Sequence, residues 1–258
     1  MADLFGFRFT RIKDEKNKEN FTTPTQDDGT IDVAGGGFFG QVLDTDGRER
    51  TEQDLIRRYR DIAQQPECDS AIEDIVNEGI VSNERAQAVS IVLDQVPYPR
   101  NIKKRITEEF NSVLRLLDFD TKGHDIFRRW YVDGRVFYHK IIDKESPRLG
   151  ISEIRYIDPR KIKKIREIRK QRTDGMPSSF AFENKFQEYY IFNERGIHPT
   201  ATSNAGGLRI ATDAIAYCPS GLVDQTHNQV LSYLHKAIKP VNQLRMIEDA
   251  VVIYRIAR

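Results

Sequence analysis

The chain of 258 residues has few cysteines, no long apolar run and almost no net charge. Its two cysteines, Cys68 and Cys218, cannot supply a disulfide framework or a four-ligand zinc site, so both are expected to be reduced thiols of an intracellular protein. No segment approaches the ~18 apolar residues that a membrane-spanning helix needs, so an integral membrane protein is not expected. The first five residues lack the basic start and the apolar run of a signal peptide.

The charges of the chain nearly cancel, with 40 Lys and Arg against 39 Asp and Glu and a formal net charge of +1. A protein built to grip nucleic acid would carry a large basic excess, so the balance argues against that class. Charged residues make up 31% of the chain, above the usual ~25%, so much of the surface is expected to be charged. The length suits one large domain or two small ones, at about 100–200 residues each.

Two short patterns resemble catalytic or cofactor sites, and each has a simpler explanation. Residues 35–40 match G-x-G-x-x-G, but a turn sequence at 44–47 stands where a dinucleotide site needs a helix, so the match is attributed to chance. Ser220, Asp224 and His227 lie within eight residues and leave open a hydrolase triad. The sequence around Ser220 is not a nucleophile elbow, and a polar turn is the favoured interpretation.

No metal, cofactor or ATP chemistry is expected. The five histidines show no i,i+4 pair with an acidic ligand, which argues against metal binding. No G-x-x-x-x-G-K-[ST] motif is present. The histidines are His124, His139, His198, His227 and His235.

Residues 1–50 are predicted to be a flexible tail that stays disordered until it is bound. A small apolar cluster near the start precedes a mixed-charge stretch and a Thr/Pro/Gly-rich stretch, with no sustained period. The ordered part is predicted to begin at Thr51, which would cap the first helix together with Asp54. That helix should end at Pro66, and Asp69 should cap the second.

Three amphipathic helices are predicted in the first half of the ordered part, and a fourth with an aromatic face over 126–131 ends at Gly134. Strands are expected over 89–93, 135–142, 154–157, 186–192, at 210 and over 214–217, so that a mostly antiparallel β unit covers about 135–217. The apolar positions of the first three helices are Leu55, Ile56, Tyr59, Ile62 and Ala63; Ile72, Ile75, Val76 and Ile80; and Ile102, Ile106, Phe110, Val113, Leu114 and Leu117.

From about Gln229 the pattern is that of a long helix whose apolar residues step by three or four. Pro240 is expected to kink or restart it, because proline removes a backbone donor. Since neither Gly, Asn nor Pro closes the run before Arg258, its apolar stripe predicts a missing partner or missing downstream sequence. The stripe is a candidate subunit interface and consists of Leu234, Ile238, Val241, Leu244, Ile247, Val251 and Tyr254.

A basic run covers residues 160–172, where only Glu167 opposes eight cations. One interpretation is a solvated strand face with Ile162, Ile165 and Ile168 turned inward, since charge runs are usually surfaces. The other is a contact for nucleic-acid phosphate or for an acidic partner, which a symmetric ring would repeat as a belt of positive potential. The cations are Arg160, Lys161, Lys163, Lys164, Arg166, Arg169, Lys170 and Arg172.

Long runs of the second half carry a family resemblance. They are Phe127–Arg135, Tyr138–Asp143, Tyr156–Lys161, Ser220–Asp224, Tyr233–Pro240, Asn242–Leu244 and Glu248–Ile256. With a thinner likeness back to Asp54–Arg60, they resemble the portal (portal vertex) protein of T4-like tailed bacteriophages over roughly residues 51–258. The likeness rests on these runs and not on a short signature.

The resemblance implies a structural protein that forms a dodecameric ring at one vertex of the viral head. Such a ring nucleates head assembly, lets double-stranded DNA pass during packaging and ejection, and later carries the neck and tail. The implied partners are copies of the chain itself, the terminase large subunit, the major capsid and scaffold or core proteins, and the neck proteins. The implied locations are the virion head vertex and, during assembly, the host cytoplasm or inner membrane. ATP hydrolysis would belong to the terminase.

Within that family the chain resembles the N-terminal wing and the start of the first stem helix, and it lacks the clip, the returning stem helix, the channel loop and the crown. The prediction is an α+β fold with a helical N-terminal part, a mostly antiparallel β unit and a long C-terminal helix. Its parts are a flexible tail (1–50), a portal wing-like domain (51–228) and the start of a stem helix (229–258), apparently truncated.

A head-to-tail ring needs two unlike faces on each subunit, and the stem stripe and the aromatic helix at 127–131 are the candidates. Two other classes stay open. One is a nucleic-acid-binding module that acts through residues 160–172, and the other is a hydrolase that uses Ser220, Asp224 and His227.

Overall fold

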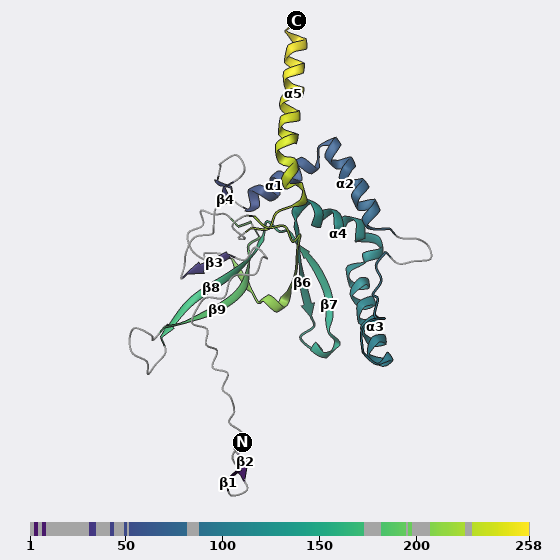
Figure 1. Ribbon diagram of the computed structural model, residues 1–258, viewed down its shortest axis with the longest axis vertical. Helices are drawn as coiled ribbons and strands as arrows, with labels where there is room; N and C mark the ends of the chain where they lie inside the picture. Colours follow the sequence, from purple (N-terminus) through teal and green to yellow (C-terminus); the bar gives the residue numbers. More distant parts are fainter. Residues whose placement is uncertain are drawn as a thin grey trace.

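The computed structural model describes residues 52–81, 88–172, 182–194, 196–197, 207–224 and 229–257, together with five short strands before residue 51. Figure 1 shows four helices on one side of two small β-sheets, and a fifth helix that projects away from the body. The predicted α+β class is therefore confirmed. The glycine-rich pattern at 35–40, the Thr51 cap and His227 lie outside the described residues, and the division into domains stays a prediction.

The helical part begins with α1 (Glu52–Ala63) and α2 (Pro66–Gly79). All five apolar positions predicted for α1 are buried, and Ile72 and Val76 of α2 are buried against them. The predicted start of α2 is wrong, because Pro66 opens that helix and Asp69 lies inside it. Proline suits the first helical position, where its missing N–H has no helical partner to lose.

Residues 88–99 do not form the strand predicted at 89–93, which has no neighbouring strand to pair with among the described residues. The next helix, α3 (Arg100–Leu117), confirms the predicted amphipathic helix but buries none of its side chains fully. Ile102 and Val113 on its apolar face are 45% and 39% exposed. Asp118 in the left-handed region (φ 50°) joins α3 to α4 (Phe119–Asp133), and Gly134 ends α4 as predicted.

Two sheets follow. One has the order β11-β6-β7 and is antiparallel, with β6 (Arg135–Ile142), β7 (Ile151–Ile157) and β11 (Ile215–Pro219). The other has the order β10-β9-β8-β3, with β3 (Ile31–Ala34), β8 (Ile162–Arg172), β9 (Phe182–Phe192) and β10 (Leu208–Ile210). β3 pairs with β8 in parallel, and the other pairs are antiparallel. Four further strands of two residues each form two antiparallel pairs. β1 (Asp3–Leu4) pairs with β2 (Phe7–Arg8), and β4 (Val42–Leu43) pairs with β5 (Glu49–Arg50).

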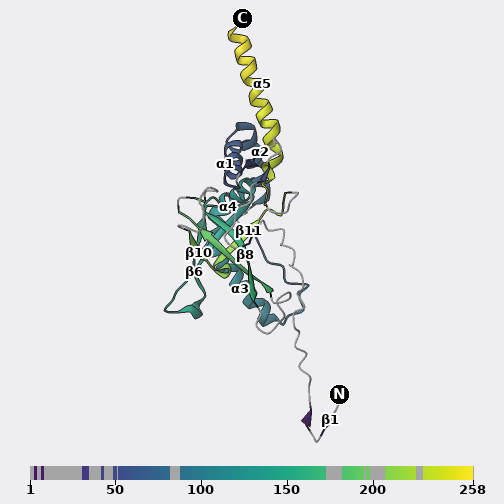
Figure 2. The same ribbon diagram turned by 90° about the vertical axis from the view of Figure 1, so that its left-hand side faces the viewer.

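The C-terminal helix, α5 (Ile238–Ile256), starts later than the sequence predicts. Residues 229–232 are not helical, and a 3-10 turn, η3 (Tyr233–Ala237), leads into α5. Pro240 is the third residue of α5, so it restarts the helix within a first turn that needs no donor from it. Figures 1 and 2 show α5 extending from the body with only its first turns beside other elements.

The main core lies where α1, α2 and α4 meet the start of α5. Tyr59, Ile62, Ile72, Val132, Leu234 and Ile238 belong to it, and Phe127, Tyr131 and Val241 pack against it partly buried. A second group, Phe137, Ile162, Tyr190 and Ile215, joins the two sheets. The core therefore holds the first turns of α5 firmly and leaves the rest of that helix outside.

Candidate subunit interface and charged sites

The predicted apolar stripe of the C-terminal helix divides into two parts. Leu234 and Ile238 are buried in the core of the chain itself, and Val241 packs against that core. Leu244, Ile247, Val251 and Tyr254 are exposed. The first part anchors α5 to the body, and only the second part is accessible to another molecule.

A second apolar face on α5 escaped the sequence analysis. It consists of Met246, Val252, Ile253 and Ile256, and at roughly 100° per residue it is centred opposite the stripe residues 244, 247, 251 and 254. Arg245 and Asp249 lie among its members, so this second face is mixed. The eight apolar side chains of the two faces are between 41% and 80% exposed. Apolar residues on two sides of a helix are unusual at a surface, so the composition of 244–256 is the signal that would have found this face.

Residues 229–237, here called the base segment, join α5 to the body by polar contacts. Ser220 Oγ donates to the Leu231 carbonyl at 2.6 Å, and Ser232 Oγ donates to the Tyr131 carbonyl at 3.1 Å. The guanidinium of Arg135 donates to the Val230 carbonyl. A hydrogen bond of 2.8 Å links Tyr59 Oη to His235 Nδ1.

A buried ion cluster lies below the base segment. Arg135, at the start of β6, has a side chain that is only 3% exposed and forms an ion pair with Glu52 at the start of α1. Lys163 of β8 pairs with the other oxygen of Glu52 at 3.3 Å. Burial and the neighbouring charge of Arg135 lower the pKa of Lys163 to about 8. The carboxylate of Glu52 therefore forms ion pairs with two cations that come from two different sheets.

The basic run is divided between contacts inside the chain and residues whose side chains are not described. Arg166 is buried, Lys163 has a side chain only 11% exposed, Lys164 pairs with Glu188 at 3.3 Å, and Arg160 bonds to Asp158. The interpretation of 160–172 as a fully solvated face is therefore wrong for its described half, although Ile162 and Ile165 are buried as it requires. β8 is central in its sheet, which gives its side chains neighbours on both flanks. For Arg169, Lys170 and Arg172 the structure places the strand only.

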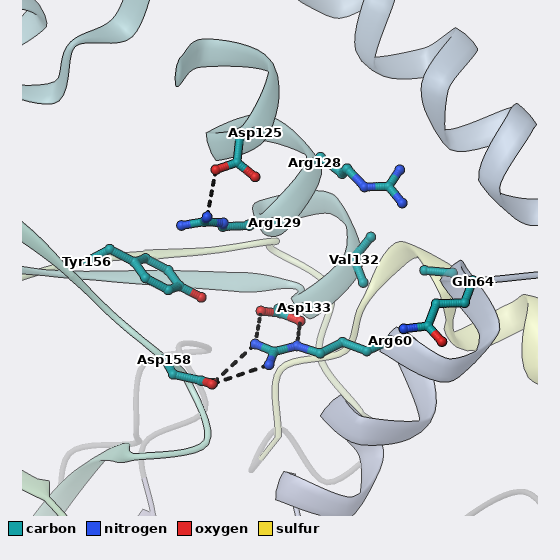
Figure 3. A pocket seen from close by; sticks show the side chains of 10 residues that line it. Arg60, Gln64, Asp125, Arg128, Arg129, Val132, Asp133, Tyr156 and Asp158 are labelled. Atoms are coloured by element: carbon teal, nitrogen blue, oxygen red, sulfur yellow. Dashed lines mark hydrogen bonds and ion pairs between the residues drawn. The ribbon is translucent and has the colours of Figure 1, made fainter. Parts of the chain in front are cut away.

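A pocket of about 350 Å³ opens between α1, α4 and the end of β7. Figure 3 shows Arg60 at its base, where the guanidinium bridges Asp133, at 2.7 and 2.8 Å, and Asp158, at 3.1 and 3.3 Å. Burial alone would raise the pKa of Asp158, but hydrogen bonds from Arg160 and Arg60 hold it well below its ordinary value. Arg129 at the rim pairs with Asp125 at 2.6 Å and lies over the ring of Tyr156. Each arginine shown in this pocket is paired with a carboxylate of the chain itself. We therefore interpret the pocket as a structural contact between α1, α4 and the end of β7.

The remaining candidates have structural roles. Ser220 is buried, and its hydroxyl, which donates to Leu231, also accepts from the Leu222 N–H at 3.1 Å, so it stabilises a turn. The aromatic helix at 127–131 stacks within the chain, with the rings of Tyr131 and Tyr233 5.1 Å apart and nearly parallel. In the part of the chain that the structure describes, no group of three or more His, Cys, Asp or Glu side chains is placed to hold a metal ion. The described helices also include none that is long and apolar enough to span a bilayer.

The structure therefore defines a mixed α+β body from which one long, largely exposed helix projects. The chain belongs to the family described as bacteriophage T4-like portal protein (Gp20), whose model matches residues 52–258. The resemblance predicted from the sequence is thereby confirmed. This family is structural and not enzymatic, so the hydrolase alternative is not carried further.

Two curated relatives show the same relationship. The chain is 39% identical over 213 residues to the portal protein of Vibrio phage KVP40, which covers 80% of this chain and 40% of that protein. It is 29% identical over 239 residues to the portal protein of Salmonella phage ViI, which covers 90% of this chain and 43% of that protein. The chain therefore spans about two fifths of the length of these relatives.

Proposed function

We propose that the chain forms the wing and the first part of the stem of a portal ring subunit at the unique vertex of a phage head. The ring would provide the conduit for packaging and ejection of double-stranded DNA. Membership of the portal family over residues 52–258 supports this function. The more detailed roles, which are docking of the terminase, contact with capsid and scaffold or core proteins and attachment of the neck, rest on the family alone, as does assembly in the host cytoplasm or at the inner membrane.

The exposed part of α5 is the observation that carries the proposal. A helical segment as short as residues 244–256 is only marginally stable when it stands alone in water, because its propagation barely outweighs the cost of nucleation. Burying its eight exposed apolar side chains would supply the missing free energy, at about 25 cal/mol per Å² of apolar surface. A closed head-to-tail ring requires two unlike faces on each copy, and α5 offers an apolar face and a mixed face that carries Arg245 and Asp249.

Electron microscopy of the full-length protein in negative stain tests the proposal. Closed rings are expected from the parent protein. Ile247→Glu and Ile253→Glu each place a charge in one apolar face of α5, so both should prevent ring formation. Glu248→Gln, at an exposed polar position between the two faces of α5, is the control and should leave the rings intact. A parent protein that stays monomeric at high concentration, or rings that survive both substitutions, would contradict the proposal.

A contact of the basic run with DNA or with an acidic partner remains a second proposal. Lys161 is half-buried and forms no ion pair among the described residues. By contrast, Arg160, Lys163 and Lys164 are each paired with a carboxylate. Lys161→Glu tests the contact better than Lys163→Glu, because Lys163 also supports the fold through Glu52. DNA binding by the parent that falls steeply with salt, and is weaker for Lys161→Glu, is the expected result. Equal binding by both proteins would remove residue 161 from the contact.

A further inference from the structure

The base segment is held to the body by directed hydrogen bonds in addition to the buried side chains of Val230 and Leu234. Besides the side-chain bonds from Arg135, Ser220 and Ser232, the Leu231 N–H donates to the Leu222 carbonyl at 2.7 Å and the Asp224 N–H donates to the Gln229 carbonyl at 2.9 Å. These groups come from α4, β6 and the turn after β11. Buried polar networks of this kind fix one geometry, because each donor and acceptor must find its partner.

Gly134 brings the base segment closer to the body than any other residue would allow. It has φ of 73°, and a Cβ atom at this position would lie 2.7 Å from the Leu231 carbonyl oxygen and 2.9 Å from the Ser232 Cα atom. Both neighbours are main-chain atoms, so a side chain could be accommodated only if the base segment moved. Gly150, in the turn between β6 and β7, has a similar φ of 87°, but a Cβ atom there would meet nothing within 4 Å.

We propose that Gly134, Arg135 and Ser232 are positioning residues that fix the angle between α5 and the body, and that this angle sets the number of copies in the ring. This inference rests on the proposed function. Gly134 sets how closely the base segment approaches, while Arg135 and Ser232 hold it at that distance. Past Arg245, every described residue of α5 is exposed, so no described element of the chain is placed to correct an error in the angle.

Ring closure makes the angle important. A helix of 19 residues is about 28 Å long, so a change of ~10° at its base moves its far end by about 5 Å, roughly the width of a side chain. Closed rings divide a full turn by the number of copies, and only about 2° per subunit separates a ring of twelve from a ring of thirteen. A small displacement of residues 230–232 is therefore enough to change the copy number.

The test compares four full-length proteins: the parent, Gly134→Ala, Ser232→Ala and the control Gly150→Ala. Symmetry classes of the rings are counted in electron micrographs, and native mass spectrometry gives the copy number. We expect one copy number for the parent and for Gly150→Ala, because alanine at 150 strains the backbone of the turn between β6 and β7, which makes no contact with the base segment. Gly134→Ala and Ser232→Ala should give a shifted or mixed copy number, with faster hydrogen exchange at 230–235.

Ser232→Ala keeps the test decisive if Gly134→Ala does not fold, because it removes one hydroxyl and adds nothing. Parental copy number in Ser232→Ala, despite faster exchange in the base segment, would overturn the inference and leave the proposed function intact. Arg135→Lys, which keeps the charge but loses the planar donor set, should also broaden the copy number if the inference is correct. A parent protein without rings would overturn the proposed function and this inference together.

Discussion

At the scale of single residues, Glu52 is the counter-ion on which two buried cations depend. Arg135 and Lys163 come from different sheets, and the carboxylate at the start of α1 lies between them. The negative charge also suits the first turn of a helix, where the backbone N–H groups point outward. This side chain therefore connects α1 with both sheets.

Glu52→Gln should destabilise the chain by about 3 kcal/mol or more, because it leaves buried charge without compensation. The free energy of unfolding, measured by urea denaturation, checks this. Glu73→Gln is the matched control, since Glu73 is exposed in the middle of α2 and its loss should change stability by less than about 0.5 kcal/mol. Equal effects of the two substitutions would show that the ion cluster contributes nothing.

Asp158 makes the stability of the chain depend on acid pH. Its pKa in the folded chain is held below its ordinary value of about 4, so the unfolded chain binds a proton more readily. The stabilisation by Asp158 is therefore complete above about pH 4 and is lost as the pH falls further, through the lowered pKa of the folded state. Asp158→Asn should flatten the fall in unfolding free energy between about pH 4 and 2, measured by urea denaturation at each pH. A profile as steep as that of Asp213→Asn, an exposed control, would contradict this.

At the scale of elements, α2 shows how a helix is held by few side chains. Ile72 is 1% exposed in the core, whereas Ile75 on the same helix is 38% exposed. Ile72→Ala should cost about 2–5 kcal/mol through lost burial and the cavity left behind. Ile75→Ala should cost less than about 1 kcal/mol, since its side chain already contacts water. Thermal unfolding of both variants measures the difference, and similar losses would mean that α2 is not docked as described.

Periodicity predicted the elements well where local physics decides them. The apolar positions of α1, the glycine end of α4 and strand β6 at 135–142 follow from spacing and from the freedom of glycine at positive φ. The prediction of the start of α2 failed because a proline at 66 is equally compatible with the end of one helix and the first residue of the next. The alternation at 89–93 failed because a strand needs a partner, and its spacing says nothing about one.

The candidate sites were harder to predict, because burial is a property of the tertiary structure. The stripe from Leu234 to Tyr254 has one continuous spacing, yet the chain's own core covers its beginning and leaves its end exposed. The basic run looks uniform in sequence, yet two of its lysines form ion pairs with distant carboxylates. Lys163 pairs with Glu52, and Lys164 pairs with Glu188. The resemblance to portal proteins supplied the class of protein, which neither spacing nor charge could have provided.

At the scale of the whole molecule, the stability of α5 should be uneven along its length. Its first turns share the core with α1 and α2, while every described residue from Met246 onward is exposed. Hydrogen exchange in monomeric protein should therefore be slow near Ile238 and fast from about Leu244 onward. In assembled protein the difference should disappear, because neighbouring copies would cover both faces. Uniformly slow exchange along α5 in the monomer would contradict this.

The exposed α5 also has a consequence for how a cell can make this protein. A newly synthesised copy exposes the apolar side chains of α5 before another copy can cover them. Exposed apolar surface of this kind promotes disordered aggregation as readily as ordered assembly. Overproduction without the other components of the assembly is therefore expected to yield precipitate. Soluble protein requires slow synthesis or a chaperone that binds α5 until other copies of the chain cover it.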